Sequence, residues 1–134
     1  MHTLTPRSLL VLLGLVLAAA ACGGAADAGS SVNLTVEDDG RAVEMEPGDR
    51  LVVALESNAS TGFRWILVTE PDPAVLSLDA SEYVEPETDL VGAPGQEVWT
   101  FLAEGDGETS LELRYERSSG EIAGKPFEVT VLVG

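Results

Sequence analysis

The sequence of 134 residues is poor in the residue types that most catalytic and metal sites require. It contains one Cys, Cys22, and one His, His2. The chain beyond Cys22 therefore cannot form a Ser-His-Asp triad, a Cys-His pair or a His-ligated zinc site. A disulfide within the chain is excluded as well, because a single Cys has no partner. These absences argue against most hydrolase chemistry, and we expect neither an enzyme nor a cofactor or metal site.

Positive charge is also scarce. Seven Lys and Arg stand against 23 Asp and Glu, which leaves a net charge of −16. Binding to a phosphate backbone needs clustered Lys and Arg, so we expect no nucleic-acid partner. The length suits a single domain, and with 45% hydrophobic residues a core is feasible without cross-links.

The N-terminus has the pattern of an export signal. Thirteen apolar residues, 9–21, follow His2 and Arg7, and such a run is too short to cross a bilayer, which takes ~20 residues. Small residues before Cys22 resemble the lipobox of bacterial lipoproteins, in which the peptide is cut before a lipidated Cys. We therefore predict a lipoprotein-type signal peptide over residues 1–21 and lipid attachment at Cys22. An ordinary signal peptide cut near residues 19–21 stays open as the alternative.

A short tether separates this signal from the domain. Residues 23–31 are only Gly, Ala, Asp and Ser, which is typical of a flexible linker, so we assign 22–31 to a tether and 32–134 to the domain. The processed chain would carry a charge of −17, because only Arg7 is lost and no acid. We expect an extracytoplasmic monomer, lipid-anchored to a bacterial cell membrane or secreted.

From Val32 onward, apolar residues alternate with polar ones at a period of two, which indicates strands. The first strand is expected to include Val36, and residues 76–78 and 82–84 are expected to form two short strands. Turn signals such as Asp39-Gly40 and Gly105-Asp106-Gly107 separate these segments, and no window of a dozen residues shows a helical stripe. Several short strands at regular spacing predict an all-β, immunoglobulin-like antiparallel β-sandwich. We place four aromatic side chains in its interior: Phe63, Trp65, Trp99 and Phe101.

The order of the strands gathers three long connections at one end. Successive antiparallel connections alternate between the two ends of a sandwich, so every second connection lies at the same end. We name these connections the first loop (about 57–62), the second loop (about 87–96) and the third loop (about 116–125). Loops at one end of a sandwich commonly carry its binding site.

Each loop carries a short motif: Asn58-Ala59-Ser60-Thr61-Gly62-Phe63 in the first, Gly92-Ala93-Pro94-Gly95 in the second and Tyr115-Glu116-Arg117-Ser118-Ser119 around the third. These motifs resemble those of the chagasin family of cysteine protease inhibitors. Its members carry N-P-T-T-G-[YF]-x-W in the first loop, G-x-G-G in the second and Y-x-R-P-W around the third. The first motif is matched by Asn58, Ser60, Thr61, Gly62 and Phe63, with Ala59 in place of Pro. Gly92 and Gly95 match the second motif, with Pro94 where the family has Gly, and Tyr115 and Arg117 match the third. Ser118 and Ser119 replace its Pro-Trp pair.

The resemblance implies a non-covalent, reversible inhibitor whose first loop enters the active-site cleft of a papain-like cysteine protease. The first loop is uncharged and small, which lets it enter a narrow cleft at little desolvation cost. The protease-binding residues implied by the resemblance are Asn58, Ala59, Ser60, Thr61, Gly62, Phe63, Gly92, Ala93, Pro94, Gly95, Arg117, Ser118 and Ser119.

Two other hypotheses stay open. The missing Pro-Trp pair suits an envelope-attached immunoglobulin-like binding module without inhibitor activity. The acidic run Glu37-Asp38-Asp39-Gly40 suggests the hypothesis of a calcium-stabilised adhesion domain, although the run lacks the spacing of the twelve-residue calcium loop. The alternating acids Glu85, Glu87 and Asp89 are interpreted as a solvated face.

Overall fold

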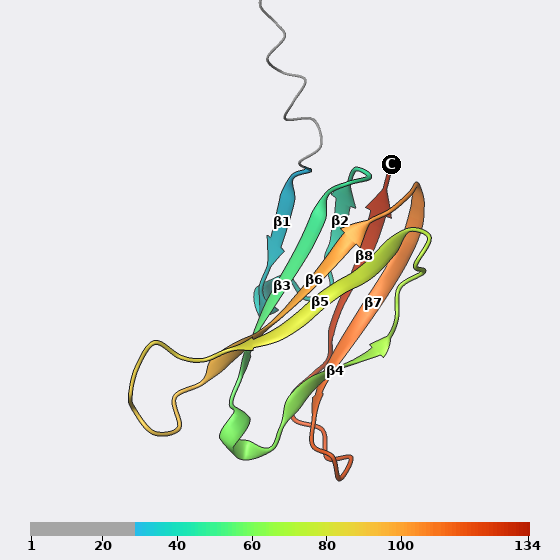
Figure 1. The fold of residues 1–134 in the computed structure, drawn as a ribbon. Coiled ribbons are helices and arrows are strands. Elements are labelled where there is room, and N and C mark those ends of the chain that lie inside the picture. The colour runs from blue at the N-terminus through green and yellow to red at the C-terminus, as the bar shows by residue number, and fades with distance from the viewer. Residues whose placement is uncertain (1–28) are drawn as a thin grey trace, which may run out of the picture.

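The computed structural model describes residues 29–134. The predicted signal peptide, Cys22 and most of the predicted tether lie outside the described residues. Within residues 29–134 the chain forms eight strands and two short 3-10 helices, drawn in Figure 1. They are β1 (Ser31–Leu34), η2 (Val36–Asp38), β2 (Ala42–Met45), β3 (Arg50–Ser57), η3 (Ala59–Thr61), β4 (Arg64–Thr69), β5 (Leu76–Val84), β6 (Gly95–Ala103), β7 (Gly107–Glu116) and β8 (Phe127–Val133).

These strands build two four-stranded sheets that pack face to face, which confirms the predicted sandwich (Figure 1). One sheet has the order β1-β3-β6-β5 and the other β2-β8-β7-β4. One pair at an edge of each sheet departs from the antiparallel arrangement: β1 runs parallel to β3, and β2 runs parallel to β8. The remaining pairs are antiparallel, as expected.

The parallel pairs arise because the chain changes sheets between β1 and β2. Asp39-Gly40 does not close a hairpin; the preceding residues form η2 instead. The Thr35 hydroxyl accepts a bond from the Glu37 N–H, while the Asp38 carboxylate accepts one from the Thr35 N–H at 2.8 Å. This capping box stabilises the short helix, which carries the chain across to the second sheet. Val36, expected in the first strand, is 56% exposed on this helix.

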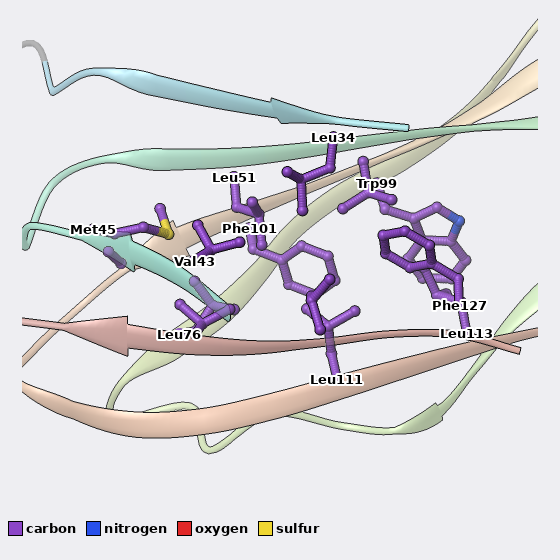
Figure 2. Packing of buried hydrophobic residues seen from close by; sticks show 14 of the residues in the cluster. Leu34, Val43, Met45, Leu51, Leu76, Trp99, Phe101, Leu111, Leu113 and Phe127 are labelled. Atoms are coloured by element: carbon purple, nitrogen blue, oxygen red, sulfur yellow. The ribbon is translucent and has the colours of Figure 1, made fainter. Parts of the chain in front are cut away.

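The inward positions of the strands form one continuous core. Phe101 and Phe127, fully buried, lie between the sheets among aliphatic side chains from both (Figure 2). Trp65 and Trp99 are buried as predicted, whereas Phe63 is only half-buried and precedes β4. The period-two pattern therefore identified the core correctly on the central strands.

The segments around Leu76 and Tyr83 belong to one nine-residue strand, β5, rather than to two short ones. Their continuity was hidden because β5 is an edge strand that is exposed over most of its length and has a register shift between Leu78 and Ala80. Its partner β6 begins at Gly95, whose missing side chain is required here. A Cβ at Gly95 would lie 2.3 Å from the Val84 carbonyl oxygen.

The three long loops lie together at one end of the sandwich, which we call the tip (Figure 1). The strand ends limit them to residues 58–63, 85–94 and 117–126. Both ends of the described chain lie at the opposite end of the sandwich. There the Ser30 N–H donates to the Asp49 carboxylate and the Gly134 N–H donates to the Met45 carbonyl. No helix in residues 29–134 is long and apolar enough to span a membrane.

The Asp38 carboxyl is expected to stabilise the fold in a pH-dependent way. Bonds from the Thr35 N–H and the Arg41 side chain hold the pKa of the Asp38 carboxyl below its usual range. A lowered folded-state pKa stabilises the fold above the unfolded-state value, about 3.9, and this contribution is lost as the pH falls through the folded-state pKa.

We therefore expect Asp38→Asn to lower the melting temperature at pH 6, and the difference from the wild type to shrink as the pH falls from 4 to 2. Thermal unfolding across this range measures the difference. Asp79→Asn, at an exposed ion pair with Arg50, is the matched control. A difference that stays constant down to pH 2 would contradict the role of the Asp38 charge.

Candidate functional site

The first loop is a closed turn that satisfies its own polar groups. Asn58 caps η3: its side-chain oxygen accepts bonds from the Ser60 N–H at 3.2 Å and the Ser60 hydroxyl at 2.6 Å. The Thr61 hydroxyl donates to the Asn58 carbonyl at 2.7 Å. Gly62 ends the turn with φ +83°, which a residue with a side chain adopts only with strain. The outer surface of the turn, formed by residues 59–62, is exposed and uncharged.

The second loop is joined to the first. The Asn58 side-chain amide donates to the Gly92 carbonyl at 2.9 Å. Gly92 has φ +82° and lies in a four-residue turn closed by the Ala93 N–H and the Leu90 carbonyl at 3.3 Å. Ala93 is half-buried, Pro94 is exposed and Gly95 is buried at the start of β6. The structure thus brings the Gly92–Gly95 segment against the base of the first loop.

The third loop supports the first from the other side. The Arg117 Nε donates to the Thr61 carbonyl at 3.2 Å, and its guanidinium lies over the Phe63 ring at 4.4 Å. The Nη1 of the same guanidinium forms an ion pair with the Glu121 carboxylate at 2.8 Å. Phe63 in turn stacks on Tyr115 at 5.4 Å between ring centroids. Arg117, predicted as a partner contact, is therefore engaged within the chain and holds the first loop in place.

Ser118 and Ser119 lie on the exposed turn of the third loop, closed by the Gly120 N–H and the Arg117 carbonyl at 2.8 Å. No hydrogen bond between these serines and the first loop is found among the described residues. They stand where the family motif has Pro-Trp, so this side of the tip presents small polar side chains.

The floor of the first loop depends on a carboxylate that the sequence interpretation missed. One oxygen of Glu97 accepts bonds from the Ser57 hydroxyl at 2.7 Å and from the Trp65 N–H at 2.9 Å. These two donors flank the first loop, so Glu97 joins its ends. Glu97 occupies an inward position of β6, in phase with Trp99 and Phe101, and a charged residue at a core position is the signal that could have revealed it.

Tyr115 and Trp65 complete this floor. The Tyr115 hydroxyl accepts a bond from the Asn58 N–H at 2.9 Å, and the Trp65 indole N–H donates to the Glu56 carbonyl at 3.0 Å. Tyr115 was assigned only by its match to the family motif, and the structure adds the hydrogen bond through which it contacts the first loop. The two ends of the first loop and the Thr61 carbonyl are therefore tied to a strand or to a neighbouring loop.

The charges of the tip are divided between its loops. Residues 57–62 carry no charge, and the second loop carries Glu85, Glu87 and Asp89. The third loop has the Arg117–Glu121 pair and Lys125. Residues 29–134 include neither Cys nor His, and within them no group of three or more acidic side chains is arranged to hold a metal ion. What the arrangement offers is a rigid, uncharged projection between two flanking loops.

Known proteins resemble this chain in sequence and in fold. The sequence profile described as chagasin family peptidase inhibitor I42 matches residues 44–131, about two thirds of the chain. No curated protein sequence matches the chain.

Three solved structures share the fold. The cysteine protease inhibitor EhICP2 from Entamoeba histolytica aligns with a TM-score of 0.70 at 21% identity, over 78% of this chain and 96% of that one. Amebosin aligns with a TM-score of 0.64 at 22% identity, over 78% and 98%. PbICP-C, solved in complex with falcipain-2, aligns with a TM-score of 0.57 at 17% identity, over 79% and 92%. Since the family profile covers more than half of the sequence, the chain belongs to the chagasin family of peptidase inhibitors.

Proposed function

We propose that this protein is a reversible, non-covalent inhibitor of papain-like cysteine proteases that occludes the active-site cleft with its first loop. The observation that carries the proposal is the support of this loop from three sides. Glu97 and Tyr115 hold it from below, Gly92 from one flank and Arg117 from the other, while its outer surface stays exposed and uncharged. A loop held in this way loses little conformational entropy on binding.

The choice of target class is supported by a structural relative. PbICP-C was solved in complex with falcipain-2, and it shares the fold of this chain. The three loops together would cover about 800 Å² of the enzyme, the usual area on one side of a stable complex. Inhibition by occlusion needs no nucleophile or imidazole of its own, which suits a domain without Cys or His.

We further propose that the chain is exported and anchored through a lipid on Cys22, and that it acts as a monomer. This proposal is supported by the apolar run and the small residues before Cys22. It also agrees with the position of Ser30, which lies at the end of the sandwich opposite the tip (Figure 1). A target enzyme would then reach the tip without obstruction by the attachment point.

A second function is favoured by one observation, the exposed Ser118 and Ser119 in place of an aromatic contact residue. Aromatic side chains are frequent hot spots at interfaces. An envelope-attached binding module that keeps the fold without inhibiting proteases would fit this replacement. Lack of papain inhibition at micromolar protein, together with capture of a non-protease envelope partner, would decide for this function.

Ala59→Arg tests whether the first loop enters a cleft. Ala59 is exposed and its side chain makes no hydrogen bond, so the substitution leaves the internal bonds of the loop intact. A bulky, unpaired charge forced into a desolvated cleft should weaken binding by about 3–5 kcal/mol. We expect the inhibition constant for papain to rise more than a hundredfold in a titration of the residue 29–134 domain.

Ala74→Arg, an exposed position at the opposite end of the sandwich, is the matched control and should inhibit like the wild type. Equal inhibition by wild type and Ala59→Arg would remove the first loop from the mechanism.

Glu97→Ala tests the floor of the loop. Two donors, the Ser57 hydroxyl and the Trp65 N–H, lose their acceptor, and an unmet buried donor costs about 1–3 kcal/mol. We expect a lower free energy of unfolding and weaker papain inhibition. Glu97→Gln should restore most of the inhibition, because an amide oxygen can accept both bonds. Loss of stability with unchanged inhibition would show that Glu97 has no part in positioning the loop.

Cys22→Ser tests the anchor. In a bacterium that processes lipoproteins, we expect the wild-type chain in the membrane fraction with a mass that includes the lipid. The Cys22→Ser chain should lack the mass of the lipid. It should either be cut at another site and leave the membrane fraction, or remain uncut. Processed chains that fractionate alike and differ in mass only by the exchange of Cys for Ser would favour an ordinary signal peptide.

A further inference from the structure

The second loop carries the two most exposed large apolar side chains among residues 29–134. The side chain of Leu90 is 75% exposed and that of Val91 is fully exposed. Elsewhere on the described surface the large apolar side chains are at most 56% exposed. Neither residue belongs to the motif that relates this chain to its family, and neither supports the fold.

Hydrogen bonds hold the backbone of the turn that carries both side chains. The Leu90 N–H donates to the Thr88 hydroxyl at 3.2 Å, and the Leu90 carbonyl closes the turn with the Ala93 N–H. Val91 stands at the apex of this turn, next to Gly92, whose carbonyl accepts the bond from Asn58. The apolar pair is therefore held at a defined place beside the first loop.

The large apolar side chain exposed on the other flank of the tip is Ile122, which at 50% is less exposed than either residue of the pair. Arg117 is engaged with Thr61, Phe63 and Glu121, and the turn beyond it presents Ser118 and Ser119. A tight interface normally buries at least one large side chain near its centre. On this tip the large side chains most open to such burial are those of the second loop.

Charge distinguishes the possible occupants of this surface. Glu85, Glu87 and Asp89 lie in the same loop, which has no Lys or Arg, and the whole chain carries −16. An anionic lipid surface and a second copy of this chain would both repel these acids. A protein surface with an apolar hollow bordered by basic side chains is complementary to the loop.

We infer that Leu90 and Val91 form the apolar anchor of the inhibitor, and that they select papain-like proteases with an apolar hollow and basic side chains on the rim beside the cleft. This inference rests on the proposed function. In it, the first loop blocks the cleft, while the second loop determines which enzymes are held tightly and for how long. The serines of the third loop are then compatible with tight binding, because the aromatic anchor they replace has a counterpart on the opposite flank.

The test is a kinetic comparison of inhibition of papain by the residue 29–134 domain. Leu90→Ser/Val91→Ser should raise the inhibition constant at least tenfold, mainly through faster dissociation, because changes within one interface act chiefly on the off-rate. Val36→Ser, at a 56% exposed apolar side chain outside the tip, is the control and should inhibit like the wild type. Thermal unfolding checks that all variants keep the fold.

A second variant tests the charges. Glu85→Gln/Glu87→Gln/Asp89→Asn should slow association with papain several-fold at low salt, and this difference should vanish at high salt, where the charges are screened. Association that is unchanged at low salt would overturn the selection for basic rims.

The outcomes separate the inference from the function on which it rests. Inhibition by the wild type with an inhibition constant unchanged in Leu90→Ser/Val91→Ser would overturn the anchor and leave the proposed function standing. No inhibition by the wild type at micromolar concentration would overturn the proposed function itself. Binding to anionic vesicles or dimerisation that is lost in the double variant, with papain inhibition unaffected, would assign the pair to a membrane or to a second copy instead.

Discussion

The geometry of the tip depends on the hydrogen bonds of a single amide side chain. Asn58 closes the first loop through its side-chain oxygen and reaches the second loop through its side-chain nitrogen. Its backbone N–H is held by Tyr115 and its carbonyl by Thr61. A carboxylate at this position could accept the bonds of the helix cap but could not donate to Gly92, and a serine could not span both contacts. The requirement for an amide follows from the simultaneous need for an acceptor and a donor.

Around this residue, internally bonded polar groups at the base of the first loop are combined with an exposed, uncharged outer surface. The buried polar groups at the base of the first loop are paired with Glu97, Glu56 and Tyr115, so the loop does not need to rearrange to satisfy them. Its small outer residues leave backbone and hydroxyl groups accessible to a partner. The rigidity that limits the entropic cost of binding and the neutrality that limits desolvation thus come from different layers of the same loop.

Much of the fold could be predicted from local pattern. Period-two alternation located the central strands, and the rule that antiparallel connections alternate between ends placed three loops at one tip. The crossing of the chain at η2 was missed because it depends on a three-residue helix, too short for any hydrophobic period. The capping signal Thr35-x-x-Asp38 was nevertheless present. The sequence predicted two short strands in place of β5, because an exposed edge strand buries few residues from which alternation can be recognised.

Site residues could be predicted where their role follows from the residue type. They could not be predicted where the role depends on contacts with residues distant in the sequence. Asn58, Gly62 and Gly92 have backbone or capping roles that their identities suggest. Arg117 stays a predicted contact with the target, and its contacts with Thr61 and Phe63 could not be predicted, since a sequence does not show that these residues lie within its reach. Glu97 comes 32 positions after Trp65, and only strand pairing reveals that its carboxylate receives the Trp65 N–H.

The separation between Ser30 and the tip has an electrostatic consequence. The strands that connect the two ends include the ten residues of β7, which span roughly 34 Å. This length is several times the Debye length of about 8 Å at physiological ionic strength. If the chain is attached to a membrane through its N-terminus with the tip directed away from it, the acids of the second loop lie beyond the reach of the lipid surface potential. Their field then acts on an approaching enzyme alone, undisturbed by the composition of the membrane behind them.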